Sequence, residues 1–303
     1  MVKIVIGIPA YNEEKNIANL LNDVLEQKIE VLEKKIEDCV HITVYVISDL
    51  STDKTDEIVN LFADKHGNVR LIRKNKRTGK SASIKLLFEL ARGYDGLILF
   101  DADVRLDINC VNVLLERIIL NKTILVAGSA IPKNDNIFNI AMQANFFGWA
   151  FVNKIKNNQR RSIYHLCGCV YAISEKLYNN PDINNITGIG DDTFIYLLCV
   201  QKNMKFEYLP SAIVHVKSPT IMNDYLNQSV RRSSGVKENE KIFGRSLVER
   251  ESKINNLFLI MLKSLFQYPF QGLCWFVLYS YGQIFISDKI KIMPNWEISS
   301  TTK

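Results

Sequence analysis

Two aspartates separated by a single alanine carry the sharpest chemical signal in the sequence. Asp101 and Asp103 directly follow a short apolar run, and carboxylates two residues apart in a turn can hold a hard divalent cation. Such a cation leaves coordination positions open for phosphate oxygens and would neutralise a diphosphate leaving group. An isolated Asp-x-Asp turn more often only caps the next helix, so the motif needs support from other parts of the chain.

Polar side chains also follow three other predicted strands. Residues 9–14 are Pro-Ala-Tyr-Asn-Glu-Glu, residues 49–53 are Asp-Leu-Ser-Thr-Asp, and Asn75 follows a third strand. Ligands bind beyond the carboxyl ends of the strands in an open parallel sheet. Asp49 and Asp53 alone also fit a helix N-cap, but the convergence of four such loops on one edge predicts a ligand site.

The elements that must position these loops alternate between β-branched runs and amphipathic stretches. Strands are predicted at 2–8, 42–48, 69–73, 96–100 and 124–128, with helices between the first and second and between the third and fourth. This alternation is typical of βα units in a mostly parallel sheet. From 137 to about 217 the pattern is more mixed, with a strand-like run at 163–173, and it predicts an appended α+β half.

The composition of the chain narrows the class of protein. It has 303 residues, 47% hydrophobic and 23% charged, which is typical of a globular protein and excludes a disordered, collagen-like or polytopic membrane chain. The formal net charge of +6 is compatible with phosphate-bearing or anionic-lipid partners. Six cysteines and an N-terminus that starts directly in a strand pattern predict a reducing, cytosolic compartment.

In sequence order, these motifs resemble family 2 of the glycosyltransferases, inverting enzymes with the GT-A fold. Residues 8–14, 48–53 and 101–103 carry the resemblance. Residues 190–193 (Gly-Asp-Asp-Thr) resemble the family's Glu-Asp motif, and residues 228–235 resemble the Gln-x-x-Arg-Trp segment of membrane-bound members. The implied fold class is α/β: a GT-A-type, Rossmann-like, mostly parallel sheet with an appended α+β acceptor half and a C-terminal apolar helical segment.

The resemblance also implies an organisation of the chain into parts. Residues 1–235 would form the glycosyltransferase domain, with a nucleotide-sugar-binding half at 1–130 and an acceptor and catalytic half at 131–235. Residues 236–303 would form a basic, apolar C-terminal segment that associates with a membrane.

The resemblance further implies roles for individual residues. Asp192 would be the catalytic base, because an inverting transfer is a single displacement in which the acceptor hydroxyl loses its proton as the diphosphate departs. Asp191 would tune this base, since adjacent carboxylates can raise each other's pKa, although both aspartates also fit a helix N-terminus. Asp101 and Asp103 would hold Mg²⁺ or Mn²⁺. The nucleotide sugar would be bound by Pro9, Tyr11, Glu13, Asp49, Lys80, Asp101, Gln228, Arg231 and Arg232.

Four positions depart from the family pattern. Ser48 replaces an aspartate, Leu50 and Ser81 each replace a glycine, and Arg232 replaces the tryptophan of the Gln-x-x-Arg-Trp segment. Since that tryptophan is associated with the growing polymer in processive synthases, its absence favours transfer of a single sugar. The expected reaction moves a sugar from a nucleoside diphosphate to a hydroxyl or phosphate of a lipid or glycan. The expected nucleoside diphosphate is UDP. It would take place at the cytoplasmic face of the cell membrane, without a nucleic-acid partner.

Two other functions remain open at the level of sequence. A catalytically degenerate domain that binds a nucleotide sugar and anchors it to a membrane would also fit the altered positions. A sugar-1-phosphate nucleotidyltransferase uses a similar sheet, but carries a glycine-rich, arginine-containing turn after the first strand. This chain has Pro-Ala-Tyr-Asn at residues 9–12 instead.

The C-terminal part of the chain combines an apolar run with a basic flank. Residues 264–287 contain no charged side chain, and residues 228–263 carry twice as many Lys and Arg as Asp and Glu. This combination predicts contact with the cytoplasmic membrane surface, with a spanning, re-entrant or interfacial placement. The same composition fits a buried helical hairpin broken at Pro269 and Gly272.

Overall fold

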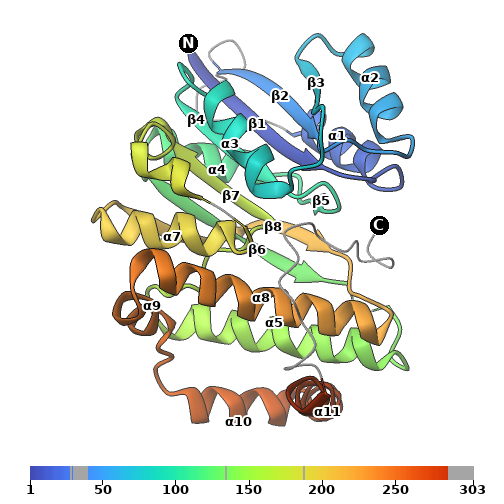
Figure 1. Ribbon diagram of the computed structural model, residues 1–303, viewed down its shortest axis with the longest axis vertical. Coiled ribbons are helices and arrows are strands. Elements are labelled where there is room, and N and C mark those ends of the chain that lie inside the picture. The colour runs from blue at the N-terminus through green and yellow to red at the C-terminus, as the bar shows by residue number, and fades with distance from the viewer. Residues whose placement is uncertain (28, 30–39, 134, 187, 286–303) are drawn as a thin grey trace.

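The computed structural model of the chain describes residues 1–303 except 28, 30–39, 134, 187 and 286–303 (Figure 1). Its centre is an eight-stranded sheet with the order β3-β2-β1-β4-β7-β6-β8-β5. The strands are β1 Val2–Ala10, β2 Val40–Ser48, β3 Val69–Arg73, β4 Gly96–Phe100, β5 Arg105–Leu106, β6 Leu125–Pro132, β7 Val170–Ser174 and β8 Phe206–Val216.

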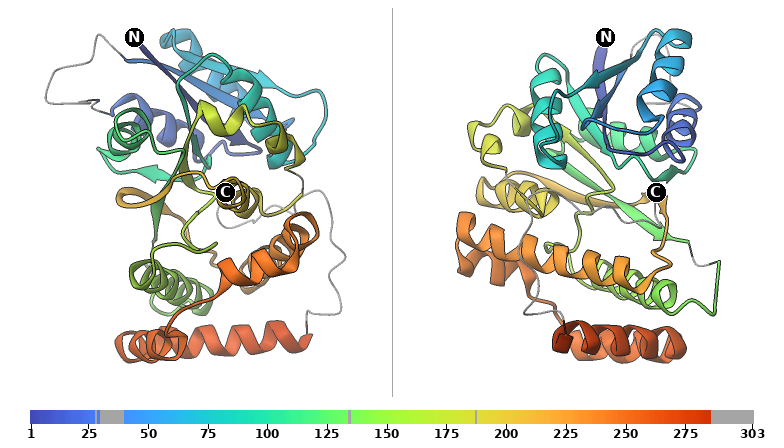
Figure 2. Two further views of the ribbon diagram at one scale, coloured as in Figure 1. Left: turned by 90° about the vertical axis from the view of Figure 1, so that its left-hand side faces the viewer. Right: turned by 45° about the vertical axis from the view of Figure 1, so that its right-hand side comes forward.

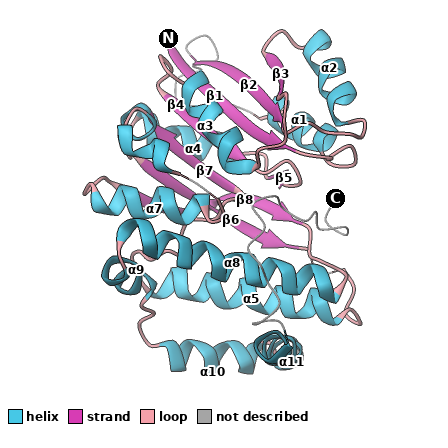
Figure 3. Ribbon diagram, viewed as in Figure 1, coloured by secondary structure: helices cyan, strands magenta, loops and turns pink. Residues whose placement is uncertain are grey.

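The helices flank this sheet and extend below it. They are α1 Ile17–Leu25, α2 Thr55–Lys65, α3 Lys80–Leu90, α4 Cys110–Ile119, α5 Ile140–Asn158, α6 Glu175–Tyr178, the 3-10 turn η1 Pro181–Asn185, α7 Asp191–Gln201, α8 Met222–Phe243, α9 Arg245–Ser252, α10 Leu257–Gln267 and α11 Pro269–Phe285. Figure 3 shows the strands enclosed between helices, with a separate helical layer at the lower end.

The sheet has a parallel N-terminal half and a mixed C-terminal half. β3, β2, β1 and β4 are parallel neighbours, whereas β7 runs antiparallel between β4 and β6. The α/β class is confirmed, and strands 69–73 and 96–100 begin and end as predicted. The prediction for 163–173 is only partly right, because the strand begins at Val170. A hydrogen bond from the Val170 N–H to the Cys167 carbonyl, 3.3 Å long, closes a turn before it.

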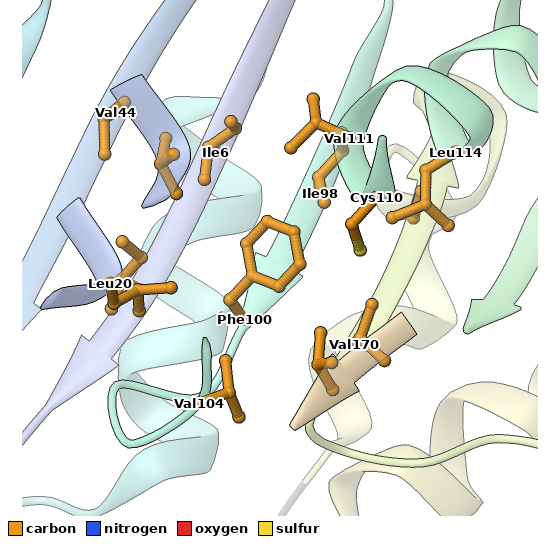
Figure 4. Close-up of a cluster of buried hydrophobic side chains, with 14 of the residues drawn as sticks. Ile6, Leu20, Val44, Ile98, Phe100, Val104, Cys110, Val111, Leu114 and Val170 are labelled. Atoms are coloured by element: carbon orange, nitrogen blue, oxygen red, sulfur yellow. The ribbon is translucent and has the colours of Figure 1, made fainter. Parts of the chain in front are cut away.

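Two hydrophobic clusters hold the central strands rigid from opposite faces. One is formed with α1, α2 and α4, and the other with α3, α6 and α7. Figure 4 shows the first cluster, in which Leu20 of α1 packs near Ile6 of β1 and Phe100 of β4. Strands buried on both faces have nearly continuous apolar sequences, as in β4, where all five residues are buried. The loops at the carboxyl ends therefore start from fixed points.

The C-terminal helices form a separate layer. α5 and α8 lie below the sheet, and α10 and α11 lie beyond them at the lower end of the molecule (Figures 1 and 2). The predicted apolar run is divided between two helices because Pro269 lacks an N–H and disfavours helical geometry in the residue before it. Tyr268 accordingly has φ −134° and ψ 64°. Residues 286–287 of the run lie outside the described residues.

The structure bears on the spanning and on the buried-hairpin alternatives for this layer. Among the described residues, no helix is both long and apolar enough to span a membrane. The predicted break occurs at Pro269, but Gly272 lies inside α11. There it allows close packing, since a Cβ on it would lie 2.5 Å from a methyl carbon of Leu265. The layer is not buried either, because Phe266 is 93% exposed.

Candidate active site

A cavity of ≈ 500 Å³ lies at the carboxyl ends of β1 and β4 and is walled by α5, the 163–169 segment, the N-terminus of α7 and helix α8. Every residue to which the family resemblance gives a role lines this cavity: Pro9, Tyr11, Glu13, Asp49, Lys80, Asp101, Asp103, Asp191, Asp192, Gln228, Arg231 and Arg232. Asp53 and Asn75 of the strand-end loops are not part of its lining, and the Asp53 carboxylate instead accepts from the N–H groups of Glu14 and Thr55. The fold thus brings together residues up to 223 positions apart in sequence. Their individual roles stay predictions.

Asp49 organises the loop that follows β3. Its two carboxylate oxygens accept hydrogen bonds from the backbone N–H groups of Thr78 (2.9 Å) and Gly79 (2.8 Å). The ammonium of Lys74 lies 2.5 Å from the same carboxylate. Because Asp49 is only 5% exposed, most of its hydrogen-bonding capacity is used inside the protein. Asp49 therefore holds the backbone of Gly79 in place at the wall of the cavity.

The loop after β1 contributes an aromatic surface, of which sequence analysis identified one of the two partners. Tyr11 was predicted, but its partner Arg77 was not: the guanidinium carbon of Arg77 lies 4.0 Å from the centre of the Tyr11 ring. Both line the cavity. Glu13 is 5% exposed and accepts a 2.7 Å hydrogen bond from the Asn16 side chain, so it supports this loop from inside.

Ser48 and Leu50, two positions at which this chain departs from the family pattern, fit the backbone at the end of β2. Ser48 is fully buried, and its hydroxyl donates to the hydroxyl of Ser51 at 3.1 Å. Leu50 has φ 64°, the left-handed conformation that glycine adopts without strain and that costs other residues about 1–2 kcal/mol. The loop therefore keeps a glycine-like conformation without a glycine.

A cluster of charged side chains lines the cavity. The Lys80 ammonium lies 2.5 Å from Asp101 and 3.9 Å from Asp191. Burial alone would lower the pKa of Lys80, but the charges of Asp101 and Asp191 raise it well above its usual value. Burial also raises the pKa of Asp191 to about 6, an effect that Lys80 opposes and that Asp192 and Asp101 reinforce.

Asp192 and Asp191 begin helix α7, so the structural and chemical interpretations of this pair coexist. One oxygen of Asp192 accepts from the Gly168 N–H at 3.0 Å, and the other accepts from the Thr193 N–H at 2.7 Å. Negative charge at a helix N-terminus is stabilised by the exposed N–H groups and the macrodipole. The carboxylate of Asp192 is thereby oriented at the cavity wall.

Helix α8 fixes the N-terminus of α7. The Glu238 carboxylate accepts from the Ile189 N–H at 2.9 Å, and the Asn239 amide donates to the Gly190 carbonyl at 3.1 Å. Gly190 has φ 88°, and a Cβ on it would lie 2.9 Å from the Cα of Gly235. Two glycines are required where the backbones of the loop and the helix touch. Sequence reasoning missed these supporting contacts.

The Cys-Gly-Cys segment at 167–169 is a backbone support rather than the strand we expected. Besides holding Asp192, Gly168 accepts a hydrogen bond on its carbonyl from the Lys80 ammonium at 3.2 Å. The Cys169 carbonyl accepts from the Asp101 N–H at 3.2 Å. Nothing in the residue types signals these contacts, because they are made by backbone atoms.

The carboxylates of the cavity suit a hard cation. One oxygen of Asp191 is buried without a hydrogen-bond partner among the described residues, beside the cavity that Asp101 and Asp103 also line. Mg²⁺ and Mn²⁺ prefer such oxygen donors and keep positions open for phosphate oxygens. Within the described part of the chain, no group of three or more Asp, Glu, His or Cys could by itself hold a metal. The donor set therefore fits a cation that shares its coordination with a bound diphosphate.

Two arginines of α8 bring positive charge to the opposite wall. Arg231 and Arg232 line the cavity together with Gln228. Burial lowers the pKa of Arg231 to about 10, although the negative charge of Asp101 favours its cation. It is therefore still charged at neutral pH. Guanidinium groups can form bidentate contacts with phosphate.

Comparison with known proteins bears on the fold and the family. Residues 5–179 match the family described as Glycosyl transferase family 2. The chain is 32% identical over 128 residues to a dolichyl-phosphate beta-glucosyltransferase of Trichomonas vaginalis, which covers 40% of this chain and 36% of that one. It is 31% identical over 117 residues to the glycosyltransferase AglD of Haloferax volcanii, and the alignment covers 39% of this chain and 18% of AglD. The alignments thus span well under two thirds of these curated relatives.

Solved structures share the architecture at low sequence identity. A mannosyltransferase from Pyrobaculum calidifontis, in complex with GDP-Man and Mn²⁺, superposes with a TM-score of 0.59 and 16% identity, covering 92% of this chain and 74% of that one. TarS 1–349 from S. aureus, in complex with UDP, gives a TM-score of 0.53 and 15% identity, with 87% and 75% covered. These similarities support the same fold.

Proposed function

Because the chain belongs to glycosyl transferase family 2, we propose that it moves a sugar, with inversion, from a nucleoside diphosphate to an acceptor at the cytoplasmic face of a membrane. The observation that carries this proposal is the meeting of carboxylates and cations in one cavity. Asp192 lies at the wall, and Lys80 lies between Asp101 and Asp191. A base, a cation site and counter-charges for a leaving diphosphate are what a single displacement requires.

The residues divide the work of this displacement. Asp192 takes the proton of an acceptor hydroxyl while the new bond forms at the anomeric carbon and the bond to the diphosphate breaks. Arg231, Arg232 and Lys80 balance the charge that develops on the departing diphosphate. A divalent cation held by Asp101 and Asp103 would add Lewis-acid stabilisation of the same oxygens.

The donor is proposed to be a UDP-sugar, with its base near the Tyr11 and Arg77 surface. Support for a nucleotide sugar comes from the structural neighbours, which hold GDP-Man or UDP. The stacked pair presents a flat, polarisable surface of the kind that aromatic bases favour.

The acceptor is proposed to be a lipid phosphate or a hydroxyl of a lipid or glycan. The two classes differ in whether the reaction needs Asp192 as a base. A phosphate monoester has a second pKa near 6 and is largely deprotonated at pH 7, so its oxygen needs no base. A hydroxyl does need one. The relatives named dolichyl-phosphate beta-glucosyltransferases support the phosphate class.

Ligand binding tests the donor site first. We expect a thermal shift of the protein with one of UDP, GDP, UDP-glucose, UDP-N-acetylglucosamine or GDP-mannose, enhanced by Mn²⁺ and lost in Asp103→Ala. Folded protein that shows no shift with any of these compounds would overturn the proposal in favour of a degenerate domain. Release of pyrophosphate from UTP and a sugar phosphate would instead indicate a nucleotidyltransferase.

Turnover of Asp192→Asn then tests the base. For a hydroxyl acceptor we expect a loss of about 10²–10⁴-fold in kcat with unchanged donor affinity. For a phosphate acceptor the loss should be much smaller. A variant that loses donor affinity in proportion to turnover would contradict a role for Asp192 in proton transfer.

A further inference from the structure

The outer surface of α10 and α11 exposes large apolar side chains of the kind that folded proteins normally bury. On α10, the side chains of Phe258, Leu262 and Phe266 are 76%, 45% and 93% exposed. On α11, Phe270, Leu273 and Phe276 are 48%, 61% and 62% exposed. We call these six side chains the apolar face. Contiguous patches of this kind on a protein surface mark interaction sites.

Both helices direct this face away from the rest of the molecule. Phe258, Leu262 and Phe266 are spaced four residues apart and form one stripe of α10, whereas Ile260 and Ser264 are buried on its other side. On α11 the buried residues Cys274 and Leu278 pack against α5 and α8. Figures 1 and 2 show the two helices as the outermost layer at the lower end of the molecule.

The charge around the apolar face favours a lipid surface over another protein. From 253 to 285 the sequence contains no Asp or Glu, and its only charged residues are Lys253 and Lys263. The ring of Trp275 stacks on that of Tyr279, with centroids 5.0 Å apart, and amphipathic rings of this type are enriched at membrane interfaces. Basic and aromatic residues around an apolar stripe are typical of helices that lie in the plane of an anionic bilayer.

We propose that the apolar face inserts into the interface of an anionic bilayer, with α10 and α11 lying in its plane. This inference rests on the proposed function for its purpose, because it brings the cavity to lipid-linked acceptors. A Cβ on Gly148 of α5 would lie 3.9 Å from Trp275 of α11, and Gly148 and Val152 also line the cavity. The lipid surface is therefore separated from the site by α11 itself and by α5, two helices that are each about 10 Å across.

Vesicle co-sedimentation of the full chain tests this placement without donor or acceptor. We expect binding to vesicles of phosphatidylcholine with 30% phosphatidylglycerol, weaker binding to phosphatidylcholine alone, and a decrease with added salt. The triple variant Phe258→Ser, Phe266→Ser, Phe276→Ser should reduce the partition coefficient by about 10³-fold, since each inserted phenylalanine contributes about tenfold.

The matched control is Leu61→Ser on α2, at the far end of the molecule, where the side chain is 63% exposed. It should bind vesicles as the unchanged protein does. Equal binding by the triple variant would overturn the proposal. So would a concentration-dependent dimer that ignores vesicles, which would assign the apolar face to a second copy.

Nucleotide binding separates this inference from the proposed function. The triple variant should keep the thermal shift with the nucleotide sugar, because its three side chains lie outside the cavity. Vesicle binding without any nucleotide shift would refute the proposed function and leave the membrane placement standing. A nucleotide shift without vesicle binding would do the reverse.

Discussion

Replacement of Asp49 by alanine separates two roles for this carboxylate. The family resemblance implies that Asp49 contacts the nucleotide. In the structure its oxygens accept hydrogen bonds from the N–H groups of Thr78 and Gly79, and Lys74 lies 2.5 Å away. If these contacts hold the loop in place, the substitution should destabilise the protein even when no nucleotide is present.

The size of the effect follows from the contacts. Hydrogen bonds to a charged group contribute about 1.5–3 kcal/mol each, so loss of the two bonds to Thr78 and Gly79 should cost about 3–6 kcal/mol in Asp49→Ala. At about 2 °C per kcal/mol for a chain of this size, the unfolding midpoint should fall by about 6–12 °C. Asp49→Asn keeps one carbonyl acceptor and should lose about half as much.

Urea unfolding without ligand and nucleotide titration of the same samples provide the measurement. Lys74→Met is the comparison variant, because it leaves both N–H bonds to Asp49 in place. It removes the ion pair and the hydrogen bonds of the ammonium to the Gly79 carbonyl (3.3 Å) and the Ser83 hydroxyl (3.1 Å), and its loss of stability should be smaller. An Asp49→Ala protein with unchanged unfolding free energy but weakened nucleotide binding would refute the structural role and restore the direct contact.

Three further substitutions, and a fourth as a comparison, probe buried charge and close packing. Asp191→Asn should raise the unfolding midpoint at pH 7 in metal-free buffer, because burial raises the pKa of Asp191 to about 6 and ionisation there opposes folding. The gain should disappear between about pH 6 and 4, where the native carboxyl takes up its proton; a gain persisting at pH 4 contradicts this. In urea unfolding, Gly190→Ala should cost about 2–4 kcal/mol from positive φ and contact with Gly235, whereas Gly93→Ala, with φ 85° but open space, should cost about 1–2 kcal/mol. Lys156→Met should raise the midpoint in calorimetry at pH 7, because burial lowers the pKa of an ammonium that has no hydrogen-bond partner among the described residues; the difference should shrink as the pH approaches 10.

The parallel half of the fold was predictable because its strands are buried on both faces. Such strands leave apolar runs that end in polar residues, and this places β4 correctly. The edge strand β3 was placed by a shorter apolar pattern, because its Arg70 and Arg73 are exposed. The run at 163–173 misled for the same reason. Apolar residues also line a buried loop, and composition does not separate a loop from a strand. A glycine between two cysteines was the available sign of a turn.

The convergence on one cavity of the residues singled out by the family resemblance was predictable, but the contacts that support them were not. The loops that follow parallel strands meet at one edge of the sheet whatever their sequence, so motifs in these loops come together in space. The partner of Tyr11 is Arg77, which lies in the strand-end loop between Asn75 and Lys80 but was not itself singled out. The proline at 269 was the visible signal that the C-terminal apolar run would form two helices. Which side of each helix stays exposed depends on packing against α5.

The turn at 167–169 links the two ends of the proposed reaction. Gly168 bonds to Asp192 through its N–H and to Lys80 through its carbonyl, and Cys169 accepts from the backbone of Asp101. The N–H and the carbonyl of Gly168 belong to two planar peptide units that join at its Cα, so a displacement of one unit reaches the other except where the φ and ψ of this glycine absorb it. A diphosphate that attracts Lys80 would shift the turn, and the shift would reach Asp192. We therefore expect donor binding to orient the base before the acceptor arrives.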